Sequence, residues 1–101
     1  MANYNAFSTE TFNKLYSTLS KNEQIWISKI RDNLEENPTG KILQFEWFRE
    51  KKYLNKRLYF LIDESSKKIL FVAFASKKEQ QNVINFVKQN MKELLEYLKN
   101  L

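Results

Sequence analysis

The sequence has no cysteine, no histidine, a single glycine (Gly40) and a single proline (Pro38) in 101 residues. Without cysteine there is no disulfide framework and no thiolate metal site. Without histidine the chain lacks the commonest general base and the usual zinc ligand. One glycine is too few for a glycine-rich phosphate loop. These absences exclude hydrolytic triads, zinc catalysis and nucleotide-binding motifs, and we expect no cofactor.

The sequence also lacks long apolar runs. No window approaches the roughly 18 apolar residues of a membrane span, and no charged leader precedes an apolar run at the N-terminus. Apolar residues make up 43% of the chain and aromatic residues 15%, which is enough for one hydrophobic core. We therefore expect a single domain over residues 1–101, located in the cytoplasm and without a membrane partner.

Positive charge is abundant and is concentrated in the middle of the chain. The formal net charge is +5, and residues 41–78 hold ten basic and four acidic residues, a net of +6, against seven basic and eight acidic residues elsewhere. Such asymmetry favours a polyanion or an acidic protein as partner. A lysine-rich solvated surface is the alternative.

Two helices are predicted before residue 40. Ser8 or Thr9 can cap the first helix, and Ser20-Lys21-Asn22-Glu23 is typical of a capping box at the start of the second. The residues after Glu36 end this helical hairpin because proline disfavours helix in the residue before it. The apolar stripes at helical spacing are Phe12, Leu15, Tyr16 and Leu19 in the first helix, and Ile25, Trp26, Ile30 and Leu34 in the second.

From Ile42 the apolar period changes from 3.6 towards 2, and aromatic and β-branched residues become common, which indicates strands. Short turns between the strands indicate an antiparallel meander. Residues 4–7 can supply one more strand. The strands of the meander are predicted at residues 43–52, 57–62 and 68–75.

The C-terminal segment is predicted to be one long amphipathic helix after a second capping box, Ser76-Lys77-Lys78-Glu79. At 1.5 Å per residue its two dozen residues would span about 36 Å, more than the width of so small a domain. Either the apolar stripe packs on the sheet, or its end projects and forms a homodimer or meets a partner. The stripe consists of Ile84, Val87, Met91, Leu94, Leu98 and Leu101.

Lysine, arginine, tyrosine and glutamate remain for chemistry, and they suffice for cleavage of RNA by its own 2′-hydroxyl. The substrate supplies the nucleophile, so the protein needs a base, an acid and cations. A lysine among other cations can serve as the base, because neighbouring positive charge favours its neutral form. Arg57 is the best candidate for a phosphate clamp, since a guanidinium can hold two phosphate oxygens.

Strand alternation separates the residues around Arg57 into two faces. Arg57 and Tyr59 share one face, which we expect to be exposed to solvent. The other face should pack on the helices, and it carries Leu58, Phe60 and Ile62.

The preceding strand interleaves aromatic and basic residues on one face, as a base-stacking surface would. For Phe45 and Trp47 core packing is the stronger alternative, whereas for Tyr53 and Tyr59 the two are balanced. The residues of this face are Phe45, Trp47, Arg49, Lys51 and Tyr53.

Glu46 and Glu50 lie four residues apart on the same predicted strand and therefore share a face. Two carboxylates on one face can bind a hard cation. Ion pairs with the surrounding basic side chains are the stronger expectation.

The order of these motifs resembles the RelE/ParE superfamily of toxins, and the resemblance covers about residues 4–84. Lys56-Arg57-Leu58-Tyr59-Phe60 is similar to the family's "YRLVY" strand, and residues 69–78 resemble its closing strand with a basic end. The N-terminal part of the resemblance comprises Phe7-Ser8, Leu15…Leu19, Ile30…Leu34…Asn37-Pro38 and Gly40-Lys41-Ile42-Leu43.

The resemblance implies an α+β fold: a small antiparallel sheet with an N-terminal helical hairpin on one face and a long C-terminal helix. It also implies a toxin of a type II toxin–antitoxin system that cleaves messenger RNA on the ribosome and is silenced by a cognate antitoxin. Matched by position, the implied catalytic residues are Arg57, Lys78 and Lys51. The implied RNA-binding residues are Arg49, Lys52, Lys56, Lys77, Tyr53 and Tyr59.

The sequence departs from the family pattern after the last strand. Ribonuclease members often carry a tyrosine or another acid–base residue there, where this chain has Val83 and Ile84. The alternative function is therefore a non-catalytic binding module, either a gyrase inhibitor like ParE or a degenerate toxin that only binds its antitoxin.

Overall fold

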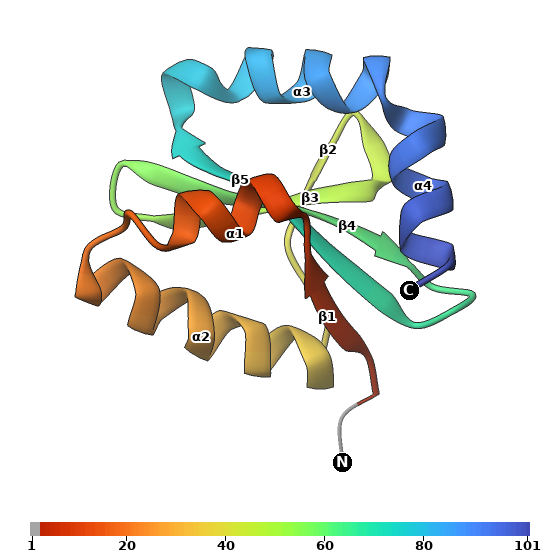
Figure 1. Cartoon of the computed structure of the whole chain (residues 1–101), viewed down its shortest axis with the longest axis horizontal. Helices are drawn as coiled ribbons and strands as arrows, with labels where there is room; N and C mark the ends of the chain where they lie inside the picture. Colours follow the sequence, from red (N-terminus) through yellow and green to blue (C-terminus); the bar gives the residue numbers. More distant parts are fainter. Residues whose placement is uncertain (1–2) are drawn as a thin grey trace.

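The computed structural model describes residues 3–101 and has an α+β fold built on one five-stranded sheet (Figure 1). The strand order is β1-β5-β4-β3-β2, with β1 parallel to β5 and all other pairs antiparallel. No helix in the described part of the chain is long and apolar enough to cross a membrane. The elements are β1 (Asn5–Ser8), α1 (Glu10–Tyr16), α2 (Lys21–Glu36), β2 (Lys41–Leu43), β3 (Phe45–Tyr53), β4 (Lys56–Asp63), β5 (Lys68–Ser76), the 3₁₀ helix η1 (Lys77–Glu79), α3 (Gln80–Gln89) and α4 (Met91–Lys99).

The predicted meander is confirmed as β3, β4 and β5, and the predicted N-terminal strand is confirmed as β1. The sheet as a whole is mixed, because β5 pairs in parallel with β1 after the chain has passed through α1, α2 and strands β2 to β4. A bulge between Tyr59 and Phe60 in the β4–β5 pairing shifts the side-chain alternation of β5, so Val72 and Ala73 both belong to the same side of the sheet.

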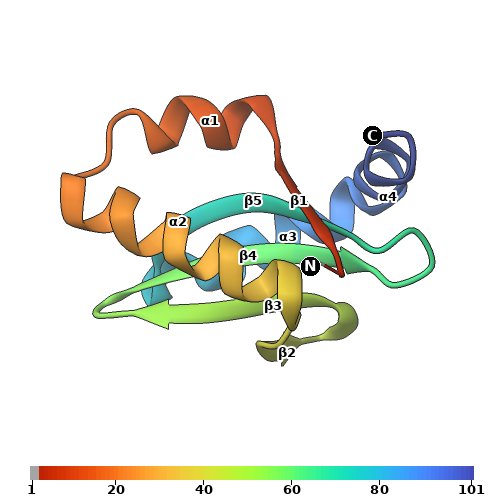
Figure 2. The ribbon, with the colours of Figure 1, turned by 90° about the horizontal axis from the view of Figure 1, so that it is seen from below.

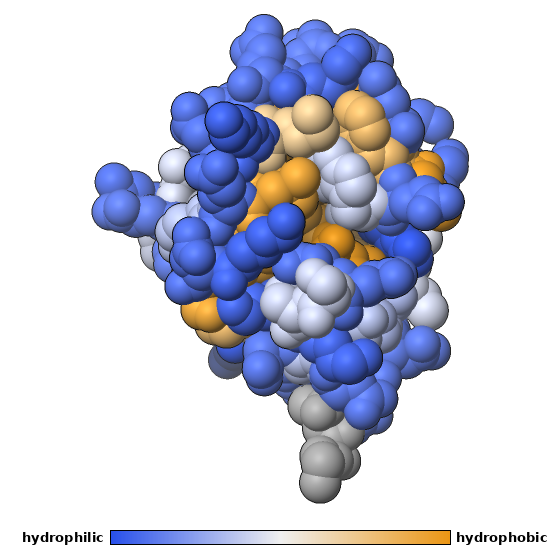
Figure 3. Space-filling model, turned by 90° about the vertical axis from the view of Figure 1, so that its right-hand side faces the viewer, coloured by the Kyte–Doolittle hydropathy of each residue, from blue (hydrophilic) through white to orange (hydrophobic). Residues whose placement is uncertain are grey.

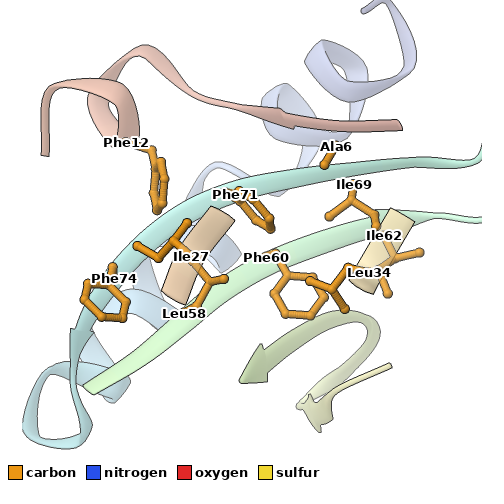
Figure 4. Close-up of a cluster of buried hydrophobic side chains, with 10 residues drawn as sticks. All are labelled: Ala6, Phe12, Ile27, Leu34, Leu58, Phe60, Ile62, Ile69, Phe71 and Phe74. Atoms are coloured by element: carbon orange, nitrogen blue, oxygen red, sulfur yellow. The ribbon is translucent and has the colours of Figure 1, made fainter. Parts of the chain in front are cut away.

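The helical hairpin covers one face of the sheet, as predicted. Thr9 caps α1 by accepting a hydrogen bond from the Phe12 amide, and Ser20 and Glu23 form the predicted capping box of α2. Figure 2 shows α2 lying across the strands, and Figure 4 shows the apolar cluster beneath the hairpin. The cluster consists of Ala6, Phe12, Ile27, Leu34, Leu58, Phe60, Ile62, Ile69, Phe71 and Phe74.

The stripe predicted for α2 is wrong at one position. Ile25 is 49% exposed, and Ile27 is the buried residue of that turn. Ile27 lies seven residues before Leu34, two helical turns, so these two share the face that packs on the sheet, whereas Ile25 is rotated away from it.

Helices α3 and α4 cover the second face, so the protein has three layers, with α2 and α3 on opposite sides of the sheet (Figure 1). The expectation that the Arg57 face is open to solvent is therefore wrong. Its apolar residues are buried in a second cluster comprising Leu43, Phe48, Tyr59, Leu61, Leu70, Val72, Val87, Leu94 and Leu98.

The predicted long C-terminal helix is broken at Asn90, whose backbone angles (φ −114°, ψ 16°) are not helical. Both the backbone N–H and the side-chain amide of Asn90 donate to the Phe86 carbonyl. The break lets α4 fold back onto the sheet and bury Leu94 and Leu98. Most of the apolar stripe thus packs on its own sheet, with Met91 and Leu101 left exposed, and the prediction of a projecting helix end is wrong.

The α4 side of the molecule retains some apolar surface. Figure 3 views this side and shows apolar side chains gathered near its centre, with hydrophilic residues around them. On α4 itself Met91 and Tyr97 are 37% and 47% exposed.

Candidate functional site

A polar cluster lies on the α3 side of the sheet, where β3 and β4 pair. Lys52 pairs with Arg57 and Glu50 with Tyr59, so these side chains share a face. Arg57 Nε lies 3.7 Å from Glu50 Oε2, and the two side chains are only 11% and 8% exposed. Gln80, the first residue of α3, donates its amide to the same Glu50 oxygen at 2.8 Å. Glu50 thus forms an ion pair, as expected, but a shielded one.

Tyr59 completes the cluster. It is fully buried, and its hydroxyl is the buried side-chain polar atom that has no hydrogen-bond partner among the described residues. Burial, with the nearby negative charge of Glu50, raises the pKa of Tyr59 to about 12, although the positive charge of Arg57 opposes the shift. The role of Tyr59 as an exposed base-stacking residue is therefore wrong.

Lys51 does not lie with Arg57. It pairs with Leu58, which faces the helical hairpin, and its ammonium donates to the Thr39 hydroxyl at 2.7 Å. A shift of one residue along a strand moves a side chain to the opposite face. Lys52, rather than Lys51, is the exposed lysine that shares the Arg57 face.

Tyr53 and Lys56 also face the hairpin, where they stabilise the fold. Tyr53 packs against Trp26 with ring centroids 4.7 Å apart. Lys56 pairs with Glu23 at 2.7 Å and lies 5.3 Å from the centre of the Phe74 ring. The hydrogen bond from Lys56, followed by that from the Ser20 backbone, lowers the pKa of Glu23.

The other predicted RNA-binding residues lie in two places, the hairpin side of the sheet and the turn after β5. Arg49 pairs with Phe60 on the hairpin side, and its Nε donates to the Glu46 carbonyl at 3.1 Å. Lys77 and Lys78 are exposed in η1, the turn that leads from β5 to Gln80. The predicted capping box there is wrong, because the Ser76 side chain makes no capping hydrogen bond.

The aromatic and acidic residues at the start of β3 are not part of the site. Phe45 and Trp47 stack at 4.7 Å and pack against the cluster beneath α3 and α4, so the core-packing alternative holds for them. Glu46 is exposed, whereas Glu50 is buried. Residues 3–101 contain no group of three acidic, cysteine or histidine side chains placed to bind a metal ion.

The cluster offers a guanidinium for a phosphate, a carboxylate that can accept a proton, and exposed lysines at its rim (Lys52, Lys77 and Lys78). Sequence reasoning missed Glu50 and Gln80 as members of this cluster. Glu50 has the parity of Lys52 in β3, which is a usable signal, whereas the approach of Gln80 depends on the turn at η1 and has no signal in the sequence.

Comparison with known proteins places this fold. No family model matches the sequence, and no curated protein resembles it at a significant level. The structure matches a double arginine-to-alanine variant of the E. coli toxin RelE in the free state, with a TM-score of 0.74, 16% identity, and coverage of 88% of this chain and 98% of that one.

Two further matches are chains from toxin–antitoxin complexes. One is the RelBE2 complex of Mycobacterium tuberculosis (TM-score 0.64, 18% identity, 73% of this chain and 98% of that chain). The other is the archaeal RelE–RelB complex of Pyrococcus horikoshii (TM-score 0.65, 15% identity, 74% and 96%). The chain therefore has the fold of RelE toxins, and the resemblance expected from its motifs is confirmed for the fold.

Proposed function

We propose that this chain is the toxin of a type II toxin–antitoxin pair and that it is a ribosome-dependent endoribonuclease. The observation that carries the proposal is the Arg57–Glu50 pair on the face of a RelE-like sheet, with exposed lysines at its rim. The solved complexes contain RelE with its RelB antitoxin, and this chain would likewise have a cognate antitoxin.

The reaction needs no cofactor. Glu50 accepts the proton of an RNA 2′-hydroxyl, the 2′-oxygen attacks the adjacent phosphorus, and the 5′-oxygen leaves and takes a proton from solvent water, which gives a 2′,3′-cyclic phosphate. Arg57 binds the phosphate and stabilises the charge that develops on it. The lysines at the rim, Lys52, Lys77 and Lys78, bind the RNA backbone.

The burial of Arg57 and Glu50 favours a second candidate function, a module that binds its partner without cutting RNA. A substrate phosphate reaches Arg57 only if the Gln80 end of α3 moves away from Glu50. A protein in which this contact stays closed would be a degenerate toxin or an inhibitor of another target such as gyrase.

Purified protein in a reconstituted translation reaction separates the two candidates. Primer extension on the translated messenger should show cuts with ribosomes and none on free RNA. Cuts that are absent in both conditions would refute the nuclease proposal, and loss of gyrase supercoiling activity in a parallel assay would then favour the inhibitor.

A further inference from the structure

The outer edge of β5 has a neighbouring strand over only part of its length. β1 pairs with residues 68–71, and the chain then leaves at Thr9, whose N–H donates to the Phe71 carbonyl at 3.2 Å. Figure 1 shows β1 turning into α1 before β5 ends. Within the described residues, positions 72–76 pair with β4 alone. Five residues of strand edge are therefore left open.

The adjoining edge, that of β1, is blocked by side chains of α2. The Ala6 N–H donates to the Glu35 carboxylate at 2.9 Å, and the Ala6 carbonyl accepts from the Arg31 guanidinium at 3.0 Å. Proteins commonly protect exposed edges in this way, since unpaired backbone groups recruit other strands. The open part of β5 has no such side chain bonded to it among the described residues.

The backbone groups at the open edge include those of Phe74. Along a strand, successive side chains point to opposite faces of the sheet, and successive backbone N–H and C=O groups point to opposite edges. Two residues whose side chains share a face therefore direct their backbone groups to the same edge. Phe71 and Phe74 lie in the same apolar cluster, and the Phe71 carbonyl points to the β1 side. The N–H and the carbonyl of Phe74 therefore point to the open edge.

A largely apolar cavity of about 360 Å³ lies beside this edge, between α1 and α3. Phe86 of α3 is 51% exposed at its wall. An open edge with an adjacent side-chain pocket is the arrangement by which sheets bind extended peptides, the edge supplying backbone hydrogen bonds and the pocket specificity. The lining consists of Thr9, Thr11, Val72, Ala73, Asn82, Val83 and Phe86, together with one acidic residue, Glu79.

Charge at the end of the edge indicates the chemistry of the ligand. Lys77 and Lys78 are exposed and follow Ser76 directly, and with the exposed Glu79 they give η1 a net charge of +1. We propose that an extended acidic segment of a partner protein adds to the sheet beside residues 72–76, with an apolar side chain in the cavity and carboxylates on these lysines. A sugar–phosphate backbone has no amides to pair with a strand edge, so a peptide fits better than RNA. The proposal goes beyond the nuclease function and does not depend on it.

The test is an NMR titration of the full chain with two synthetic peptides, Glu-Glu-Thr-Val-Thr-Val-Thr and the same sequence reversed. At least one should bind and shift the backbone amide of Phe74. Phe86→Ser should weaken binding at least tenfold, and so should the pair Lys77→Glu and Lys78→Glu. Ile25→Ser is the matched control, because Ile25 is 49% exposed on the opposite side of the protein and should leave binding unchanged.

Two methylated peptides test the backbone contacts, one methylated on its valine amides and the other on its threonine amides. The valine amides point to β5 if the peptide is parallel and the threonine amides do so if it is antiparallel, so one of the two should lose binding. The proposal is overturned if neither peptide binds, if both methylated peptides bind as well as their parent, or if Phe86→Ser binds as well as the wild type. It is also overturned if a ten-nucleotide polyuridine alone shifts the Phe74 amide as the peptide does, since RNA would then occupy the edge. None of these measurements uses ribosomes, so the outcome is independent of RNA cleavage.

Discussion

Arg57 and Glu50 lie on adjacent strands with Nε and Oε2 3.7 Å apart, and the end of α3 shields both side chains from solvent. The arginine therefore has two roles: it is the proposed phosphate ligand, and it compensates a buried carboxylate. A substitution that removes only one partner changes stability as well as chemistry.

The first prediction concerns this coupling. Arg57→Ala should lower the free energy of unfolding by about 3 kcal/mol, because it leaves the Glu50 carboxylate buried and unpaired. Adding Glu50→Gln should recover much of the loss, since the second change removes the uncompensated charge. Urea denaturation of the wild type, both single variants and the double variant gives the coupling energy. Strictly additive effects would show that the two side chains do not interact.

The second prediction concerns the unpartnered hydroxyl of Tyr59. Tyr59→Phe should stabilise the protein by about 1 kcal/mol at neutral pH, because it removes a buried polar group that has no partner. The measurement is the urea denaturation midpoint. A destabilised variant would show that the hydroxyl makes a contact that the structure does not contain.

The same substitution tests the raised pKa of Tyr59. The folded protein holds the phenolic proton up to about pH 12, whereas the unfolded chain releases it near 10. The free energy of unfolding is therefore unaffected by this titration below pH 10 and falls as the pH rises from 10 to about 12, because only the unfolded chain loses the proton there. The wild type should lose more stability than Tyr59→Phe across this interval, and parallel pH curves would contradict the shift.

The third prediction concerns the turn between β3 and β4. Leu54 is 75% exposed and adopts a φ of 52°, a conformation that glycine enters without the penalty of a Cβ. Leu54→Gly should relieve about 1–2 kcal/mol of backbone strain. The greater flexibility of glycine in the unfolded chain costs about 0.5–1 kcal/mol, so the substitution should stabilise the protein. Asn55→Gly is the control and should destabilise slightly, because Asn55 is not in the positive-φ region. A rise in melting temperature for Leu54→Gly alone is the expected outcome.

The sequence predicted the helical hairpin on one face and the strand order of the meander because both have local signals: the capping box at Ser20, the proline at residue 38 and the change of period at Ile42. It did not predict the bend at Asn90. The apolar spacing continues unchanged across that residue, and the bend is decided by tertiary burial of Leu94 and Leu98.

The candidate site was only half predictable. Arg57 was found from the strand motif, but Lys51 was assigned where Lys52 belongs, because a register error of one residue inverts a strand. The face of Arg57 was expected to be exposed because no sequence signal places α3 over it. A buried carboxylate such as Glu50 is recognisable only once that covering layer is known.

The proposed cleavage of RNA by Glu50 and Arg57 is tested most directly by primer extension on a translated messenger after induction of each variant. Glu50→Gln keeps the size of the side chain and an oxygen for the Gln80 amide, so the fold should persist while cleavage falls on the order of 100-fold. Lys67→Asn, in the turn before β5 where asparagine tolerates the φ of 55°, should cut like the wild type. Cutting by Glu50→Gln at the wild-type rate, or an absence of cuts with the wild type itself, would contradict the proposed role of Glu50 and Arg57.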